Sequence, residues 1–206
     1  MRQQFVHLFV FDSMADWEPA FAIAAINNPQ FQQTPGRFRV VTVGQTMRPV
    51  TTMGGLRIQP DITLAELSPV ASSMLILPGG ETWESGANLP AVNAARSFIA
   101  TGVPVAAICA ASLALARAGL LDNRRHTGND RESFAACGYR GRTFYTDAPA
   151  VTDKHVITAG GIAPVDFARE IIRSLRLYND AALEAWYALF KHGDTARYYD
   201  LVRSAA

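Results

Sequence analysis

Short apolar runs alternate with helical patterns along almost the whole chain, and this alternation limits the fold more than any other feature. The predicted strands cover residues 5–11, 38–43, 74–77, 105–108, 143–145 and 156–159. The predicted helices cover residues 19–27, 90–100, the segment after Cys109, 164–177, 181–191 and the tail 196–202. Such alternation predicts an α/β fold with a mostly parallel sheet and helices on both of its faces. Gly54-Gly55 additionally predicts a hairpin between 50–53 and 56–59.

Length and composition narrow the class of protein further. The chain has 206 residues, 49% of them hydrophobic, which is enough to build a single domain over residues 1–206. Its 19 Lys and Arg residues balance 18 Asp and Glu residues, so no charge excess favours nucleic acid or an acidic membrane surface. The run at 5–11 is too short to span a membrane and lacks a signal-peptide cleavage site. With two cysteines and no disulfide framework, we expect a cytoplasmic protein.

Cys109 lies at the joint between the predicted strand 105–108 and the helix that follows it. In the middle of a strand, a lone cysteine is usually a small buried hydrophobic residue. At a sharp strand-to-helix turn, its sulfur instead meets the positive end of the helix, which favours the thiolate. The same helix N–H groups, beginning with Ala110, can hold an oxyanion. We therefore predict that Cys109 is a nucleophile.

Glu18 stands at the start of the first predicted helix, after the strand 5–11. An acidic residue there has an ordinary explanation, because it satisfies helix N–H groups. The functional interpretation places its carboxyl group beside Cys109, where burial would raise its pKa and make it a general acid or base. Asp16 is a rival for this role because it lies so close in sequence.

Gly79 and Gly80 follow the buried strand 74–77 and suit a turn. The same lack of side chains lets the backbone approach a substrate and direct an N–H at a developing oxyanion. The carboxyl ends of parallel strands share one edge of a sheet, so we expect this loop, the segment before Glu18 and Cys109 to converge there. Trp17 and Trp83 either wall that crevice or simply pack in the core.

Several of these segments together resemble the ThiJ/PfpI superfamily. They are Leu77-Pro78-Gly79-Gly80, Ala107-Ile108-Cys109-Ala110, the acidic residue after the first strand, Gly119-Leu120-Leu121-Asp122 and Ile157-Thr158-Ala159-Gly160-Gly161. The resemblance runs from about residue 4 to 190 and implies the flavodoxin-like three-layer sandwich of class I glutamine amidotransferases. It implies that Cys109 is the nucleophile, Glu18 its acidic partner, and Gly79, Gly80 and Ala110 the oxyanion or substrate-binding backbone. Since relatives are often oligomers, it also implies a homodimer.

The histidine departs from the pattern of this superfamily. Many relatives have a histidine directly after the cysteine, where this chain has Ala110. Others have one after the elbow helix, where the chain reads Arg125-His126-Thr127-Gly128-Asn129, so that Asn129 falls at the usual histidine position. Asn129 also reads as a helix cap, with Glu132 completing a capping box. His126 is a candidate base, or else a loop histidine with no catalytic part.

These residues predict a cysteine-dependent hydrolase, or a glyoxalase or deglycase-like enzyme, that acts on small carbonyl or amide compounds. Alternatives are a redox sensor or stress chaperone without enzymatic activity, and an intracellular peptidase. Because expelling an amine benefits from a proton donor, an insecure histidine weakens the peptidase alternative. No dinucleotide, phosphate-loop or zinc motif occurs in the sequence, so we expect no cofactor and no metal. The expected partner is a small-molecule substrate.

Overall fold

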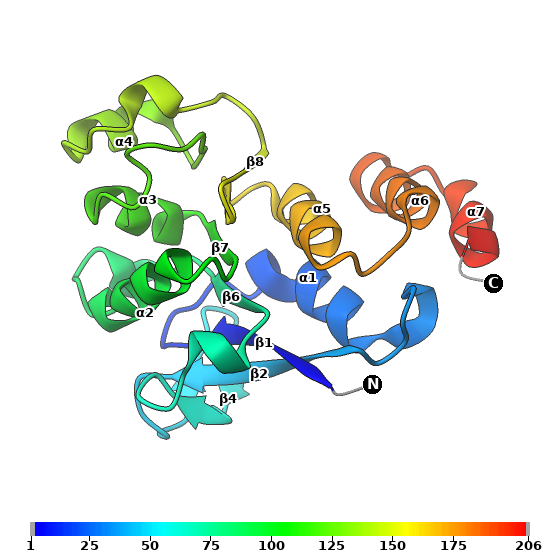
Figure 1. The fold of residues 1–206 in the computed structure, drawn as a ribbon, viewed down its shortest axis with the longest axis horizontal. Helices are drawn as coiled ribbons and strands as arrows, with labels where there is room; N and C mark the ends of the chain where they lie inside the picture. Colours follow the sequence, from blue (N-terminus) through cyan, green and yellow to red (C-terminus); the bar gives the residue numbers. More distant parts are fainter. Residues whose placement is uncertain (1–2, 205–206) are drawn as a thin grey trace.

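A computed structural model describes residues 3–204, whose strands form a seven-stranded sheet in the order β5-β2-β1-β6-β7-β9-β8 (Figure 1). Neighbouring strands run parallel except for β8, which is antiparallel to β9. The strands of this sheet are β1 (Gln4–Phe9), β2 (Phe38–Gly44), β5 (Ile62–Thr63), β6 (Met74–Leu77), β7 (Val105–Ile108), β8 (Ala150–Asp153) and β9 (Val156–Ala159). The predicted α/β sandwich is therefore confirmed.

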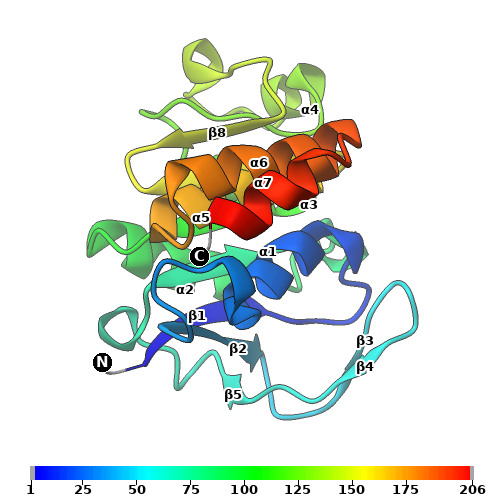
Figure 2. The same ribbon diagram turned by 90° about the vertical axis from the view of Figure 1, so that its right-hand side faces the viewer.

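Helices cover both faces of the sheet and make the outer layers of the sandwich (Figures 1 and 2). One layer holds α1 and α5, with α6 and α7 stacked outside α5, and the other holds α2 and α3, with α4 beyond α3. The helices are α1 (Trp17–Asn27), α2 (Leu89–Ala100), α3 (Ala110–Arg117), α4 (Arg131–Ala136), α5 (Pro164–Leu175), α6 (Asp180–His192) and α7 (Arg197–Ser204). The topology is that of an open, doubly wound sheet.

The centre of the sheet forms the core and fixes where a ligand crevice can lie. Every residue of β6, β7 and β9 is buried, as expected for strands covered on both faces. After β1, the chain adds β2 and then β5 on one side of β1, and it later adds β6 and β7 on the other side. This reversal of strand order at the β1–β6 boundary is the position at which open α/β sheets bind ligands.

Residues 143–145 were predicted as a strand, and this prediction is wrong. They belong to a short 3-10 helix, Arg142–Phe144, followed by Tyr145, which makes only an isolated bridge to His126. The Tyr145 ring packs edge-on against the rings of His126 and Phe134, so its burial comes from an aromatic cluster rather than from the sheet. Short apolar runs leave this ambiguity when periodicity is the only guide.

The antiparallel edge strand β8 was not predicted from the sequence, and its turn explains why. Lys154 and His155, which join β8 to β9, both have positive φ, 45° and 64°. Two-residue hairpin turns usually place Asn or Gly at such positions, so the sequence carried no hairpin signal. The predicted hairpin around Gly54-Gly55 is confirmed, with β3 (Val50–Thr51) antiparallel to β4 (Arg57–Ile58).

Asp16 attaches this β3–β4 hairpin to the segment in front of α1. Its carboxylate accepts hydrogen bonds from the Thr52 hydroxyl at 2.5 Å and from the Gly54 N–H at 2.6 Å. The backbone adds a bond from the Met53 N–H to the Met14 carbonyl at 2.9 Å. Asp16 therefore has a structural task that occupies both of its carboxylate oxygens.

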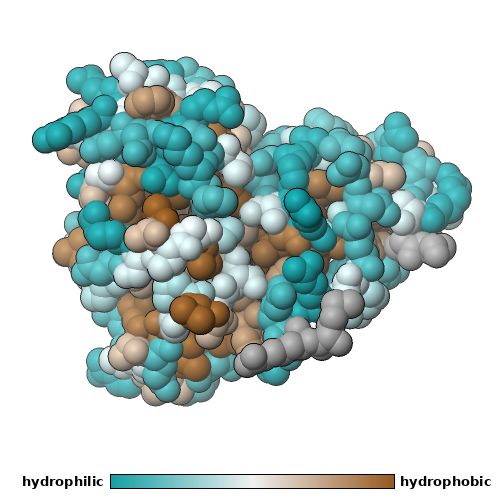
Figure 3. Space-filling view, viewed as in Figure 1, coloured by the Kyte–Doolittle hydropathy of each residue, from teal (hydrophilic) through white to brown (hydrophobic). Residues whose placement is uncertain are grey.

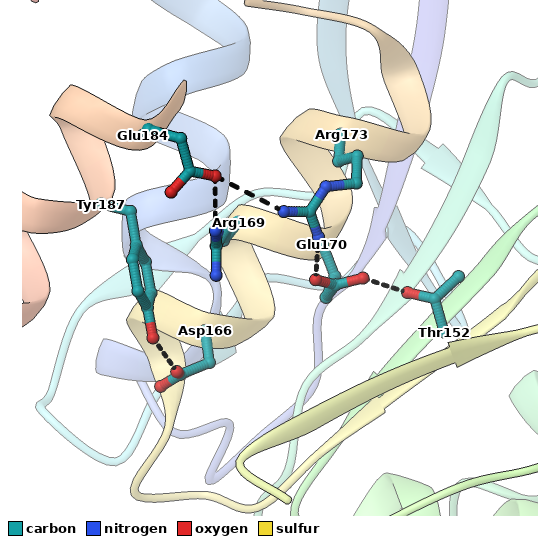
Figure 4. Close-up of polar contacts among 7 residues, drawn as sticks. All are labelled: Thr152, Asp166, Arg169, Glu170, Arg173, Glu184 and Tyr187. Carbon is teal, nitrogen blue, oxygen red and sulfur yellow. Dashed lines mark hydrogen bonds and ion pairs between the residues drawn. The ribbon is translucent and has the colours of Figure 1, made fainter. Parts of the chain in front are cut away.

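A polar network fixes α6 on α5 and extends to β8 (Figure 4). The buried Asp166 in the first turn of α5 accepts the Tyr187 hydroxyl at 2.6 Å and the Lys191 ammonium at 2.7 Å, and burial raises the pKa of Tyr187 to about 12. Arg169 pairs with Glu184 at 2.5 Å, and Glu170 accepts the Thr152 hydroxyl at 2.6 Å. This network holds the start of α5 and the loop before it in place.

The outer surface is mixed in character. In the space-filling view, hydrophilic side chains predominate over α6 and α7 at the right. Hydrophobic side chains form separate patches over the left part of the molecule, where Figure 1 shows the sheet and α2 (Figure 3). No helix within residues 3–204 is long and apolar enough to cross a membrane.

Candidate active site

Cys109 sits at a strained turn between β7 and α3. Its backbone angles are φ 60° and ψ −129°, in a region that non-glycine residues rarely occupy and that costs of the order of 1–3 kcal/mol. The turn is held by the Cys109 N–H on the Ala159 carbonyl at 2.9 Å and by the Ser112 N–H on the Cys109 carbonyl at 3.0 Å. The buried Ser112 hydroxyl also donates to the Ala107 carbonyl at 2.9 Å. The predicted elbow is confirmed, and the surrounding structure compensates for its strain.

Glu18 reaches the same point from the first turn of α1, and only 1% of its surface is exposed. Its Oε2 accepts the Gly79 N–H at 2.5 Å. Its Oε1 is buried and accepts no N–H or O–H group from the described part of the chain; the thiol of Cys109 is the polar group that it can meet. One carboxyl oxygen is thus anchored to the backbone while the other is left for the sulfur.

Two glycines let the backbone close around the sulfur. A Cβ on Gly79 would lie 3.0 Å from the Cys109 Sγ and 2.9 Å from the Glu18 Oε2. A Cβ on Gly161, after β9, would lie 2.9 Å from the same Sγ and 3.1 Å from the Glu18 Oε1. Both positions therefore exclude every larger residue. The sequence prediction included Gly79 but missed Gly161, although Gly160-Gly161 follows a buried strand just as Gly79-Gly80 does.

The structure assigns different surroundings to the three backbone positions predicted for oxyanion binding. The Gly79 N–H already donates to Glu18, whereas the Ala110 N–H, at the start of α3, lowers the pKa of the Cys109 thiol. Gly80 lies against the 11–13 segment, where a Cβ would come within 2.5 Å of the Ser13 carbonyl oxygen. Of the three N–H groups, that of Ala110 is the one that acts on the ionisation of the reacting atom.

Burial dominates the ionisation of both reactive groups. It raises the pKa of Glu18, against the opposing effects of hydrogen bonds from Gly79 and Cys109. It also raises the pKa of the Cys109 thiol; the Asn129 amide and the Ala110 N–H lower that pKa, and the charge of Glu18 raises it further. The prediction that the helix would make the thiolate the favoured form is therefore wrong in its net direction, because loss of solvation outweighs the helix N–H group.

Asn129 is the third side chain in contact with the sulfur. Its Nδ2 donates to the Cys109 Sγ at 3.2 Å, and its Oδ1 accepts the Gly161 N–H at 2.8 Å. The prediction that Asn129 caps a helix is wrong: Asp130 caps α4 and accepts the Ser133 N–H at 2.6 Å. One residue further along, Asp130 satisfies the helix and leaves the Asn129 amide free to bridge the sulfur and the 160–161 loop.

His126 is not brought to the sulfur in this structure. Its Nδ1 hydrogen-bonds the Arg124 carbonyl at 2.9 Å and its Nε2 the Tyr139 hydroxyl at 2.7 Å, so both ring nitrogens are occupied. The ring is fully buried and stacks on Phe134 with centroids 5.5 Å apart. Burial lowers the pKa of His126 and keeps the ring neutral. These contacts give His126 a packing task away from the Cys109 turn.

Replacing Asn129 by alanine is expected to raise the pKa of Cys109, because a hydrogen bond to the thiolate disappears. Such a bond to a charged group contributes about 1.5–3 kcal/mol, so alkylation of Cys109 by iodoacetamide at pH 7.5 should slow by about tenfold or more. The rate is measured by mass spectrometry of the peptide that contains Cys109. The exposed Asn123, changed to alanine, is the control. An alkylation rate unchanged by Asn129→Ala contradicts the assignment.

Known proteins are similar to this chain over most of its length. The family model for the DJ-1/PfpI family matches residues 4–174. A Bacillus subtilis protein called uncharacterized protease YoaZ is 38% identical over 207 residues, covering 99% of either chain. The crystal structure of a thiJ/pfpI family protein from Bacillus anthracis superposes with a TM-score of 0.92 at 39% identity, covering 100% of this chain and 98% of the other.

More distant relatives bear the names of enzymes with different reactions. The glutathione-independent glyoxalase DJR-1.2 of Caenorhabditis elegans is 25% identical over 144 residues, which are 68% of this chain and 75% of that protein. The deglycase PfpI of Pyrococcus furiosus is 37% identical over 79 residues, which are 38% of this chain and 48% of that protein. The names of the relatives thus include protease, glyoxalase and deglycase.

Proposed function

Because the chain belongs to the DJ-1/PfpI family, we propose that it is a cysteine-dependent enzyme of the glyoxalase type that converts small 2-oxoaldehydes into 2-hydroxy acids. One observation carries this proposal: among the described residues 3–204, Glu18 is the only side chain at the Cys109 sulfur that can exchange a proton. Asn129 donates a hydrogen bond but has no titratable proton. The site therefore suits a reaction in which a single group takes a proton and gives it back.

The isomerisation of a 2-oxoaldehyde is such a reaction. The thiol of Cys109 adds across the aldehyde carbonyl, with the sulfur bonding to carbon and the proton passing to oxygen, to give a hemithioacetal. The Glu18 carboxylate then takes the C1 proton, leaving an enediolate, and the hydroxyl proton on the C1 oxygen passes to the C2 oxygen. Glu18 returns the carbon-bound proton to C2, which makes a thioester of the 2-hydroxy acid. Water hydrolyses the thioester, releasing the acid and the free thiol. No external oxidant or reductant is needed, since C1 is oxidised as C2 is reduced.

The surroundings of Cys109 support this reaction over peptide cleavage. Burial raises the pKa of Glu18, which moves the carboxyl toward the range in which one group can both take and give a proton. Peptide cleavage requires a proton for the departing amine, and Asn129, which donates to the sulfur, has no titratable proton to supply, so that Glu18 alone would have to serve.

The test is product formation from methylglyoxal, followed by proton NMR with the purified, fully reduced protein. We expect lactate at a rate well above that in buffer. Failure to form lactate while Cys109 is shown to be a free thiol overturns the proposal. So does release of ammonia from simple amides, or cleavage of peptides, in the absence of lactate.

A further inference from the structure

Two large apolar side chains lie exposed beside the loop that touches the Cys109 sulfur. Ile162, which follows Gly161, is 99% exposed, and Trp17, next to Glu18, is 49% exposed. The Trp17 indole N–H donates to the Gly161 carbonyl at 3.1 Å, so the indole and Ile162 flank the same peptide unit. The structure separates the two tryptophans singled out in the sequence, because Trp83 is buried and its N–H donates to the Pro78 carbonyl.

This pair, which we call the apolar rim, lies close to the reacting atom. A Cβ built on Gly161 would lie 2.9 Å from the Cys109 Sγ. Ile162 is the next residue in the chain, and Trp17 donates its hydrogen bond to the Gly161 carbonyl. A carbonyl compound bound to the sulfur would lie beside the peptide unit that these two side chains flank. Apolar surface exposed at the mouth of a reactive site is suited to covering an apolar group of the ligand.

In the part of the chain that the structure describes, no cationic side chain is bonded to the residues around the sulfur. Among residues 3–204, no Lys, Arg or His side chain forms a hydrogen bond or ion pair with Glu18, Cys109, Asn129 or Gly161. Arg131, two residues after Asn129, pairs instead with Asp147 at 2.6 Å. Asp16, two residues before Glu18, adds a negative charge on the side of the hairpin. An anionic substituent would lose its hydration here without gaining a partner.

We infer that the apolar rim makes Ile162 and Trp17 specificity-determining residues, which select 2-oxoaldehydes with a neutral, apolar substituent over those with an anionic one. This inference rests on the proposed function, and it adds the substrate class. Contact of a substituent with one or two apolar groups of the rim, set against the cost of desolvating a carboxylate, is expected to discriminate by about 10-fold. We therefore expect kcat/KM for phenylglyoxal to exceed that for 4-carboxyphenylglyoxal, which has the same ring and one added charge, by at least about tenfold.

The experiment compares these two substrates in Ile162→Ser and Ile162→Arg. Ile162→Ser should lower kcat/KM for phenylglyoxal by about tenfold. Ile162→Arg should lower it similarly and raise the value for 4-carboxyphenylglyoxal, because the guanidinium pairs with the added carboxylate. Val70→Ser is the matched control: Val70 is 96% exposed, but it precedes β6 and so lies at the opposite edge of the sheet from Cys109. It should leave both values unchanged.

A second measurement separates the failure of this inference from the failure of the proposed function, because it needs no turnover. Cys109 is alkylated with phenacyl bromide and with 4-carboxyphenacyl bromide, and the partly buried Cys137 of the same molecule provides an internal reference. Relative to Cys137, Cys109 should prefer the neutral reagent by several fold, and Ile162→Arg should abolish or reverse that preference.

The outcomes are distinct. A protein that lacks glyoxalase activity but shows this alkylation preference loses the proposed function and keeps the apolar selectivity of the site. Turnover of both substrates with a ratio that neither Ile162 variant alters by more than twofold overturns the role of the rim. An equal alkylation preference at Cys109 and Cys137 overturns it as well.

Discussion

Replacement of Cys109 by alanine is expected to lower kcat for methylglyoxal by at least about 10⁴-fold, because the residue that forms the covalent intermediate is gone. The variant should fold normally. Alanine keeps the Cβ and hence the same backbone preferences at φ 60°, and the bonds that anchor the turn come from the backbone and Ser112. Lactate formation is measured by NMR, and the fold by circular dichroism and thermal unfolding.

Cys137 provides the matched control for this result. It is the other free cysteine among the described residues, and its thiol donates to the Phe134 carbonyl, outside the Cys109 site. Cys137→Ala should retain full activity. A Cys109→Ala protein that still forms lactate at the wild-type rate would show that the sulfur does not take part in the reaction.

Replacement of Glu18 by glutamine is expected to lower kcat by about 10²–10⁴-fold, the usual contribution of a general acid or base. The same change should make Cys109 more reactive toward iodoacetamide near neutral pH, because the charge and the hydrogen bond of Glu18 both raise the pKa of the thiol. A fall in turnover together with a rise in thiol reactivity distinguishes proton transfer by Glu18 from general damage to the site. Damage would lower both.

The free energy of unfolding should depend on pH differently in the wild type and in Glu18→Gln. Burial raises the folded-state pKa of Glu18 above its ordinary value of 4.5. The stability associated with the protonated carboxyl is therefore complete below pH 4.5 and is lost as the pH rises through the folded pKa. Glu18→Gln lacks this loss, so its free energy of unfolding should fall less than that of the wild type above pH 4.5. Urea denaturation from pH 4.5 upward measures the difference.

Asp16→Asn separates Glu18 from its rival in the sequence. Asp16 binds Thr52 and Gly54 of the hairpin, so its replacement should loosen that hairpin. It should not change the reactivity of Cys109 toward iodoacetamide. If Asp16→Asn reproduced the pairing of lost turnover and raised thiol reactivity, the acid–base role would belong to Asp16 instead.

Much of the site was predictable because parallel strands deliver their loops to one edge of the sheet. The apolar runs at β1, β6 and β7 were sufficient to place the segments around Glu18, Gly79 and Cys109 together, and the structure brings these three residues into contact. Gly161 obeys the same rule after β9 but was missed, because glycine pairs are also ordinary turn residues.

Asn129 and His126 were not predictable in the same way. They lie three residues apart in a segment that is neither strand nor regular helix, so no periodicity indicates which side chain faces the sulfur. The choice depends on the burial of the His126 ring against Phe134 and Tyr139 and on the capping of α4 by Asp130. The burial of the His126 ring and the capping of α4 both depend on tertiary contacts, and local sequence patterns do not predict such contacts.

The sequence by itself determined the α/β sandwich and the place of Cys109 at a strand–helix joint. Hydrophobic periodicity and the order of strands and helices along the chain can be read locally, and the topology of parallel sheets then brings the loops after the strands to one edge. Only the tertiary structure decided the chemistry at that joint. It buried Glu18 and the thiol together, raised the pKa of both, turned Asn129 rather than His126 toward the sulfur, and exposed Ile162 beside it. Solvation and side-chain contacts depend on neighbours distant in sequence, and these set what the cysteine can do.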